Sequence, residues 1–336
     1  MGHSSQQINV SAHVAIWYAI AAITFGARPL SEKVCRTAFL MYILFLQIAS
    51  AHHMLVEPGF SSEWKIFNTS YAMYLAVLGS MVHGMTVPGS IEAAQRSRGL
   101  TKGMFEWLRK APWGNPAFAG MFMSLVFFGF IGGISGVVMG TEQINLIMHN
   151  TLYVPGHFHG TVVAGTTLAF MAITYYLIPL VFRREIMFMK LAKLQPYLFG
   201  IGAAGISVFM MGAGTLGVSR RHWDMQFADA ILPFDYPSAA FLMMGLNGMF
   251  AVLAAVGGIA FIVVVVGSVF FGRKLGKDER PSYPEVPPQA AVVAEHGSAG
   301  SLKIPGTTML VAIFFIAFVL YYFVNWKYLS EIWPLS

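Results

Sequence analysis

Long apolar segments constrain the fold of this chain more than any other feature of its sequence. Of the 336 residues, 56% are hydrophobic and 11% are charged, whereas soluble domains carry about 25% charged residues. About 20 apolar residues in a helix span the hydrocarbon core of a bilayer. Segments of this kind lie near residues 8–25, 34–55, 66–90, 116–139, 151–181, 195–218, 236–271 and 306–326. The sequence therefore predicts an all-α fold, a polytopic transmembrane bundle of about eight helices forming a single domain over residues 1–336 in membrane lipid.

The basic residues are shared unevenly between alternate connections of these predicted helices. The connections after the first, third, fifth and seventh helices hold 17 of the 21 Lys and Arg residues. By the positive-inside rule these connections are cytoplasmic, and the surplus positive charge is a topology signal that needs no nucleic-acid partner. The last of them, residues 278–304, is rich in Pro, Ala and Gly, and we expect a flexible cytoplasmic loop there.

Two histidines, His157 and His159, lie inside the fifth apolar segment on either side of Phe158. An ionisable side chain in a membrane is costly and by default marks a functional site. Successive residues of an α-helix are rotated by about 100°, so residues two apart point to nearly opposite sides. The two imidazoles therefore cannot share one metal. Separate sites with one imidazole each are the arrangement that heme irons take.

A second pair, His52-His53, ends the second apolar segment, and His3 lies at the start of the chain. Under the predicted topology these residues and the other two histidines lie toward the same, outer side of the membrane. Imidazole binds copper, zinc and iron alike, so the ligand type does not choose the metal. The alternative interpretation is a pair of interfacial histidines without a metal. Together, the five histidines indicate two hemes and a tris-histidine metal.

Four stretches resemble the catalytic subunit I of the heme–copper oxidase superfamily. They are AHHMLVEPGFSSEWK (51–65), APWGNPAF (111–118), HNTLYVPGHFHG (149–160) and SRRHWD (219–224). The sequence that flanks the histidines looks most like that of the B family of cytochrome c oxidases. The resemblance covers essentially the whole chain, but it matches the carboxyl-terminal part of that subunit, from within its sixth helix onward. It implies an integral protein of a bacterial or archaeal inner (plasma) membrane.

The resemblance assigns metal-binding roles to the five histidines. It implies that His157 is the axial ligand of a high-spin heme and that His159 is one axial ligand of a low-spin heme. It implies that His3, His52 and His53 bind copper, or non-heme iron as the alternative.

The resemblance also assigns the outer-side loops to the heme propionates. It implies that His149, Arg220 and Arg221 hold these carboxylates, and the fixed donor fork of arginine suits that role. The alternative is that the two arginines are ordinary residues of an outer loop and do not bind a heme. Glu57, just past the histidine pair, is either an active-site polar group or a plain interfacial carboxylate.

Ser80, His83 and Thr86 recur at intervals of three residues on one face of the third predicted helix. In the B family a polar track on this helix leads protons from the cytoplasm to the copper site, and histidine titrates near ambient pH. The alternative is that these polar residues join neighbouring helices.

Gln7 departs from the family pattern, which places a tyrosine four residues after the first copper histidine. Glutamine cannot supply the phenolic proton and electron for breaking the O–O bond. Related nitric oxide reductases lack this tyrosine. We therefore expect a respiratory oxidoreductase that reduces oxygen to water with proton uptake, with nitric oxide reduction as the alternative. The alternative from a different class is a non-catalytic b-type heme membrane protein.

The expected partners follow from what the matched part of the subunit lacks. In the family, the second axial ligand of the low-spin heme belongs to an upstream helix. We therefore expect an upstream half of subunit I, or a separate chain, to supply it. Electrons are expected from a cytochrome c or a cupredoxin, through a partner similar to subunit II.

Overall fold

The computed structural model of the chain describes residues 2–46, 53–221, 235–283 and 303–332. Within these ranges every regular element is a helix, and isolated bridges join Thr151 to Ser219 and Arg184 to Lys274. The α-helices (α) and π-helices (η) are α1 (Gly2–Phe25), α2 (Glu32–Met41), η1 (Tyr42–Leu46), α4 (Ser62–Ile66), η3 (Phe67–Ala72), α5 (Met73–Ser97), α6 (Glu106–Arg109), α7 (Pro116–Phe127), η4 (Phe128–Gly133), α8 (Ile134–Gly140), α9 (Glu142–Met148), α10 (Tyr153–Phe158), η5 (His159–Thr167), α11 (Leu168–Val181), α12 (Met189–Thr215), α13 (Ser238–Phe271) and α14 (Pro305–Ile332).

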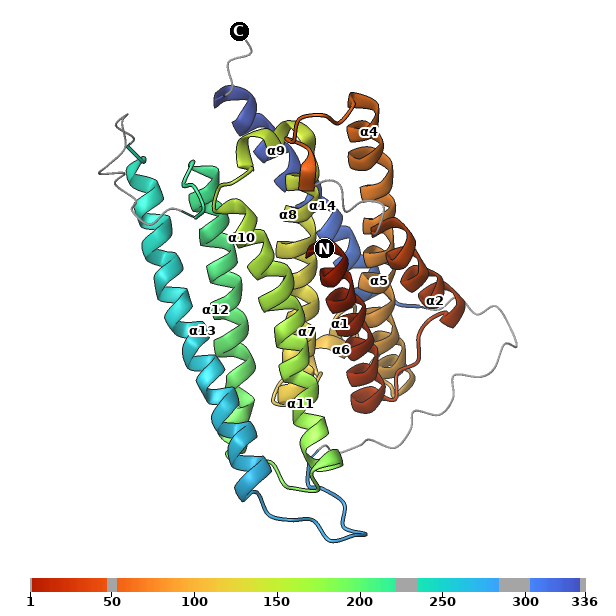
Figure 1. The fold of residues 1–336 in the computed structure, drawn as a ribbon. Coiled ribbons are helices and arrows are strands. Elements are labelled where there is room, and N and C mark those ends of the chain that lie inside the picture. The colour runs from red at the N-terminus through yellow and green to blue at the C-terminus, as the bar shows by residue number, and fades with distance from the viewer. Residues whose placement is uncertain (1, 47–52, 222–234, 284–302, 333–336) are drawn as a thin grey trace.

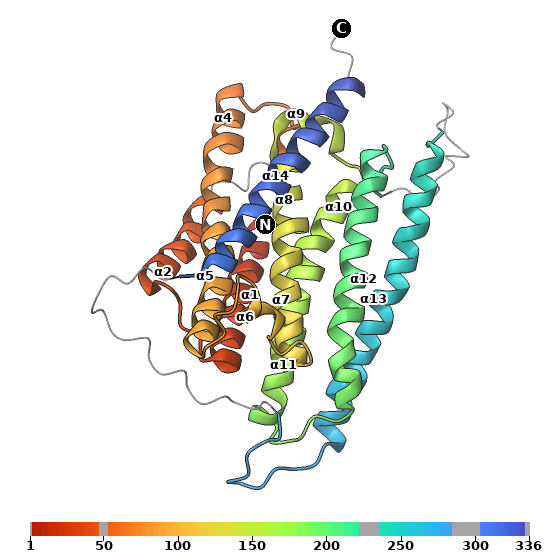
Figure 2. The same ribbon diagram turned by 180° about the vertical axis from the view of Figure 1, so that it is seen from behind.

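Six helical stretches in the described part of the chain are long and apolar enough to cross a membrane. They are Ile8–Phe25, Pro116–Gly140, Tyr153–Val181, Met189–Thr215, Ser238–Phe271 and Pro305–Asn325. The prediction of an all-α, polytopic helical bundle is confirmed. The connections after α11 and α13 lie at one end of the bundle, and α4, α9 and the start of α10 lie at the opposite end (Figures 1 and 2).

Glycines allow α12 and α13 to approach closely along one side of the bundle (Figure 1). A side-chain carbon added at Gly202 would overlap the backbone of Ala254, and one added at Gly257 would overlap the backbone of Phe199. Small residues at such contacts let the backbones of membrane helices meet. Gly214 plays the same part between α12 and Tyr153, so the start of α10 is held directly against α12.

The beginning of the predicted 278–304 loop makes specific contacts with the bundle. The Tyr283 hydroxyl donates to Asn115 Oδ1 at 2.7 Å, and its ring stacks on Tyr176 with centroids 5.5 Å apart. Ser282 donates to the Glu185 carboxylate through both its backbone N–H and its hydroxyl. Residues 284–302 lie outside the described ranges.

Candidate heme and metal site

His157 is held by α8, the neighbouring helix. Its Nδ1 lies 3.0 Å from Ser135 Oγ, and that hydroxyl donates to the backbone carbonyls of Ile131 and Gly132. Because the single hydroxyl proton of Ser135 is used in this way, the hydroxyl accepts from the Nδ1–H of His157. A neutral imidazole then carries its lone pair on Nε2, the state in which metal-ligating histidines are held by their second ring nitrogen.

The ring of His157 also depends on the absence of a side chain at Gly136. A carbon added there would lie 2.9 Å from His157 Cε1. Ser135 and Gly136 were not predicted as site residues, because their role arises from the contact between α8 and α10 and not from their own sequence surroundings.

His159 is prepared for a ligand in a different way. Its Nδ1 lies 2.7 Å from the carbonyl oxygen of Pro155, one turn earlier on the same helix. A carbonyl accepts only, so Nδ1 carries the proton and Nε2 the lone pair. Both histidines therefore present Nε2 with the chemistry that a heme iron requires. The helix is π-helical over His159–Thr167 and α-helical again in α11, so the α-helical geometry predicted for the segment does not hold throughout.

His53 lies close to the heme-ligand candidates. It is exposed and interacts electrostatically with both His157 and His149. The fold thus brings a predicted copper ligand near the predicted high-spin heme ligand. His52 lies outside the described residues, and so do the side chains of two residues in the first turns of α1, His3 and Gln7.

No three His, Cys, Asp or Glu side chains gather into a metal-binding group within the part of the chain that the structure describes. Of the three predicted copper ligands, the side chain of His3 and the whole of His52 fall outside that part. The tris-histidine site therefore stays a prediction.

The predicted propionate residues occupy two loops that are joined at the same end of the bundle. The bridge between Thr151 and Ser219 pairs the loops, and the Arg220 N–H donates to the Asn150 carbonyl at 2.8 Å. This pairing fixes Arg220 beside the start of α10. Arg221 follows with a left-handed backbone (φ 65°) and an exposed side chain.

Electrostatic interactions connect His149, Arg220 and Glu57. Burial lowers the pKa of His149 from its ordinary value, and the positive charge of Arg220 lowers it further. Glu57 acts in the opposite direction on the same imidazole. Arg220 Nε is buried and has no hydrogen-bond partner among the described residues. An unpaired guanidinium N–H is a group that a carboxylate would satisfy, so this residue fits a heme propionate.

The three polar residues predicted on α5 lie where α5 meets the first helices. His83 is fully buried, and its Nδ1 lies 3.0 Å from the Tyr18 hydroxyl on α1. The same hydroxyl lies 2.5 Å from Thr86 Oγ1. Ser80 accepts a hydrogen bond of 3.0 Å from the hydroxyl of Tyr42 on η1.

Tyr18, Tyr42 and Cys35 were missed by the sequence argument. The Tyr18 hydroxyl also donates to the buried thiol of Cys35 on α2 at 3.2 Å. These residues come from three other helical segments, and no spacing within one segment reveals that they surround His83. Only the packing of the helices shows it.

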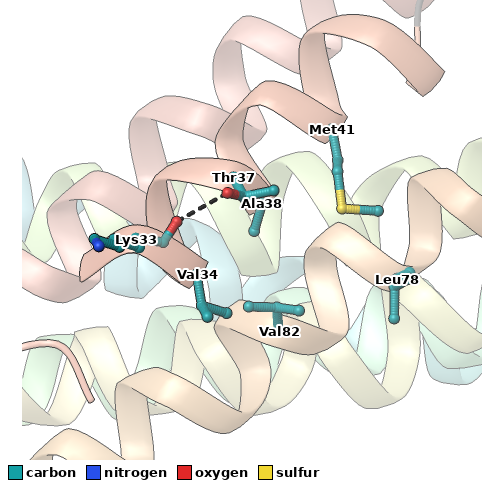
Figure 3. Close-up of a pocket in the computed structure, with 7 residues that line it drawn as sticks. All are labelled: Lys33, Val34, Thr37, Ala38, Met41, Leu78 and Val82. Atoms are coloured by element: carbon teal, nitrogen blue, oxygen red, sulfur yellow. Dashed lines mark hydrogen bonds between the residues drawn. The ribbon is translucent and has the colours of Figure 1, made fainter. Parts of the chain in front are cut away.

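An apolar groove of about 250 Å³ lies on the outside of this region, between α2 and α5 (Figure 3). Its lining residues are Lys33, Val34, Thr37, Ala38, Met41, Leu78 and Val82. None of the predicted site residues lines it, so the groove is separate from the candidate heme and metal site.

Comparison with known proteins identifies the family. The family described as "Cytochrome C and Quinol oxidase polypeptide I" matches residues 1–259. Cytochrome c oxidase subunit 1 of Thermus thermophilus is 34% identical over 286 residues, which cover 83% of this chain and 48% of that protein. Cytochrome c oxidase subunit 1 of Synechocystis sp. is 25% identical over 76% of this chain and 40% of that protein.

A solved structure gives the same result. A chain of a heme-copper terminal oxidase dimer superimposes with a TM-score of 0.75 at 25% sequence identity, covering 97% of this chain and 55% of that chain. The present chain thus spans about half the length of the relatives that it matches. It belongs to the cytochrome c and quinol oxidase polypeptide I family, as the carboxyl-terminal part of a heme–copper oxidase subunit I.

Proposed function

We propose that this chain supplies the metal-binding part of a respiratory oxidase that reduces oxygen to water with proton uptake. The observation that carries the proposal is the state of His157. Its Nδ1 proton is held by Ser135, its Nε2 is left for a metal, and His53 lies nearby. A heme ligand beside a second metal ligand is the arrangement that a binuclear oxygen-reducing centre needs.

The remaining roles follow from the same proposal. His157 would ligate the high-spin heme, and His159 would ligate the low-spin heme. His3, His52 and His53 would hold copper. When bound, these groups supply the electron-transfer chemistry, whereas the protein supplies their spacing and ligation.

The outer-side loops and the α5 cluster complete the site. We assign the heme propionates to His149, Arg220 and Arg221, because Arg220 Nε is buried without a hydrogen-bond partner in the described part of the chain. We assign proton delivery to Ser80, His83 and Thr86 on α5. Tyr18 forms hydrogen bonds with His83 and Thr86, and Tyr42 forms one with Ser80 and packs its ring against His83.

The proposal requires further chains. The second axial ligand of the low-spin heme would come from the remaining helices of subunit I, and electrons would come from a cytochrome c or cupredoxin through a partner similar to subunit II. The complex would lie in a bacterial or archaeal inner membrane, with the metal sites toward the outer side.

Nitric oxide reduction is the second candidate, and Gln7 is the observation that favours it. Oxygen reduction draws four electrons, and in the family the tyrosine supplies one of them. Nitric oxide reduction needs two and does not require a phenol. Steady-state rates with each gas, measured on the complete complex with one electron donor, distinguish the two functions. We expect oxygen turnover to exceed nitric oxide turnover, and the reverse ranking would replace oxygen by nitric oxide as the substrate.

Replacement of His52 and His53 by alanine tests the tris-histidine site. We expect the double variant to lose about one copper or non-heme iron per complex and to keep both hemes, because these imidazoles would hold the second metal and neither heme iron. Elemental analysis with heme spectra measures both quantities. Full occupancy of the second metal in the double variant would contradict the assignment. If the wild-type complex contained no second metal, the non-catalytic b-type alternative would be favoured.

A further inference from the structure

The last helix that the structure describes, α14, has no role in the proposed function. It begins on α5, where the Glu92 carboxylate accepts the N–H groups of Gly306 and Thr307 at 3.0 and 2.6 Å. From there it crosses α5 and α8 toward the end of the bundle that holds α9 and the start of α10 (Figure 2). Its carboxyl-terminal half therefore lies near the point where α10, the helix of His157, begins.

A hydrogen bond between two tyrosines joins α14 to the start of α10. The hydroxyls of Tyr153 and Tyr321 lie 3.0 Å apart, although the two residues are 168 positions apart in the chain. Tyr153 is fully buried, and Tyr321 is the partner that its hydroxyl has among the described residues. A buried hydroxyl without a partner lowers stability, so the burial of the Tyr153 hydroxyl depends on Tyr321.

Tyr153 lies one helical turn before His157. The α10 helix is α-helical over Tyr153–Phe158, and residues four apart share one face of an α-helix. The backbone of Tyr153 also lies directly against Gly214 of α12. The first turn of α10 is therefore fixed from two sides, by α12 at the backbone and by α14 at the hydroxyl, and the next turn carries His157.

The same helix α14 also packs against the segments around Ser135. The Phe314 ring meets that of Phe130 on η4 edge-on, with centroids 5.3 Å apart. Further along, α14 packs against a buried cluster that combines Ile134 of α8, the neighbour of Ser135, with Tyr153 of α10. One helix thus supports both the segment that carries Ser135 and the segment that carries the histidine held by it.

We propose that Tyr321 is a positioning residue for the high-spin heme ligand, which keeps the His157 ring aligned with Ser135 through its hydrogen bond to Tyr153. The proposal rests on the proposed ligation of the high-spin heme by His157. A hydrogen bond from Nδ1–H of a metal-ligating histidine makes the imidazole more basic and fixes its orientation. Without the Tyr321 hydroxyl, Tyr153 loses its partner, the first turn of α10 shifts, and the 3.0 Å contact between His157 and Ser135 lengthens.

The test is the iron–histidine stretching band of the reduced complete complex, recorded by resonance Raman spectroscopy. Its frequency follows the basicity of the imidazole, which depends on the hydrogen bond of Nδ1–H. Tyr321→Phe keeps the ring and removes only the hydroxyl. In this variant the band should broaden and move to lower frequency. The spectrum of the low-spin heme should stay unchanged, because His159 is held by Pro155 of its own helix.

A double variant shows whether Tyr321 acts through the contact between His157 and Ser135. Ser135→Ala alone should shift the band in the same direction and further, because it removes the acceptor altogether. Adding Tyr321→Phe to Ser135→Ala should then produce little additional shift, since residues that act through one contact are not additive. Fully additive shifts would place the effect of Tyr321 elsewhere and overturn the proposal.

Tyr322→Phe is the matched control. Tyr322 is the next residue of α14, is half-buried like Tyr321 and packs against the same buried cluster. Its hydroxyl forms no hydrogen bond within the described part of the chain. The variant loses the same atom from the same helix and should keep the wild-type band. An equal shift in Tyr322→Phe would show that any such loss from α14 disturbs the heme, and would overturn the proposal.

Tyr153→Phe covers the case in which Tyr321→Phe does not assemble. It removes the other hydroxyl of the pair and should shift the band in the same way. An unshifted band in either assembled variant would overturn the proposal. Failure of the proposed heme ligation is recognised separately, because the iron–histidine band of the wild-type complex would then survive in His157→Ala.

Discussion

Replacement of His159 by alanine should abolish the spectrum of the low-spin heme and leave carbon monoxide binding at the other heme intact. Replacement of His157 should have the opposite effect and remove carbon monoxide binding. The expectation follows from the separate supports of the two rings. His157 is held by Ser135 of α8, whereas His159 is held by the Pro155 carbonyl of its own helix.

Optical spectra of the reduced complex, with and without carbon monoxide, measure both outcomes. Phe158→Ala is the natural control, because Phe158 lies between the two histidines, is 37% exposed and offers no ligand nitrogen. It should preserve both hemes. Loss of carbon monoxide binding in His159→Ala but not in His157→Ala would reverse the assignment.

Ser135→Ala refines the test of His157. The ligand stays, but the acceptor for its Nδ1–H is removed. Loss of such a supporting hydrogen bond typically lowers metal affinity by about 10- to 100-fold. The high-spin heme should therefore be retained less firmly in this variant, with the low-spin spectrum unchanged.

Glu92→Gln should strongly destabilise the bundle, by about 3–5 kcal/mol in the free energy of unfolding. The Glu92 side chain is fully buried and pairs with Arg96 Nε at 2.8 Å. Its carboxylate also accepts the N–H groups of Gly306 at 3.0 Å and Thr307 at 2.6 Å. Those groups open α14, where a negative charge is favoured by the helix dipole. The neutral amide leaves Arg96 without its counter-charge.

The ion pair between Glu32 and Arg36 provides a matched comparison. It has the same spacing of four residues, but its side chains are 68% and 77% exposed. Glu32→Gln should change stability by no more than about 0.5 kcal/mol. Denaturant unfolding in detergent compares the two variants, and limited proteolysis reports whether α14 detaches. Equal changes in the free energy of unfolding would show that burial does not make the Glu92 ion pair more important for stability than the exposed Glu32 pair.

The all-α transmembrane fold could be predicted from sequence because it depends on segment length and apolarity alone. The histidines of the fifth apolar segment could be singled out because an imidazole is costly there. The residues that hydrogen-bond to the buried histidines could not be predicted from the sequence. Ser135 and Tyr18 are ordinary residues on helices that pack beside the site, and only the three-dimensional contacts with His157 and His83 give them a role.

His13 shows the same limit from the other side. On sequence alone it is indistinguishable from a histidine used for packing. In the folded chain its Nδ1 lies beside the Thr166 hydroxyl, and its Nε2 is buried without a hydrogen-bond partner among the described residues. Residue spacing does not reveal such contacts between helices that are far apart in the sequence.

The π-helical stretch η5 has a consequence for the alignment of residues along the heme-bearing helix. A π-helix is usually an α-helix that has accommodated an inserted residue. Deleting one residue between His159 and Thr166 would let the segment return to the α-helical path. Because the π-helical turn absorbs the extra residue, the side chains after the deletion would keep their orientation relative to the helix before it. The π-helical stretch therefore lets the number of residues in this segment change without rotating α11 against its neighbours.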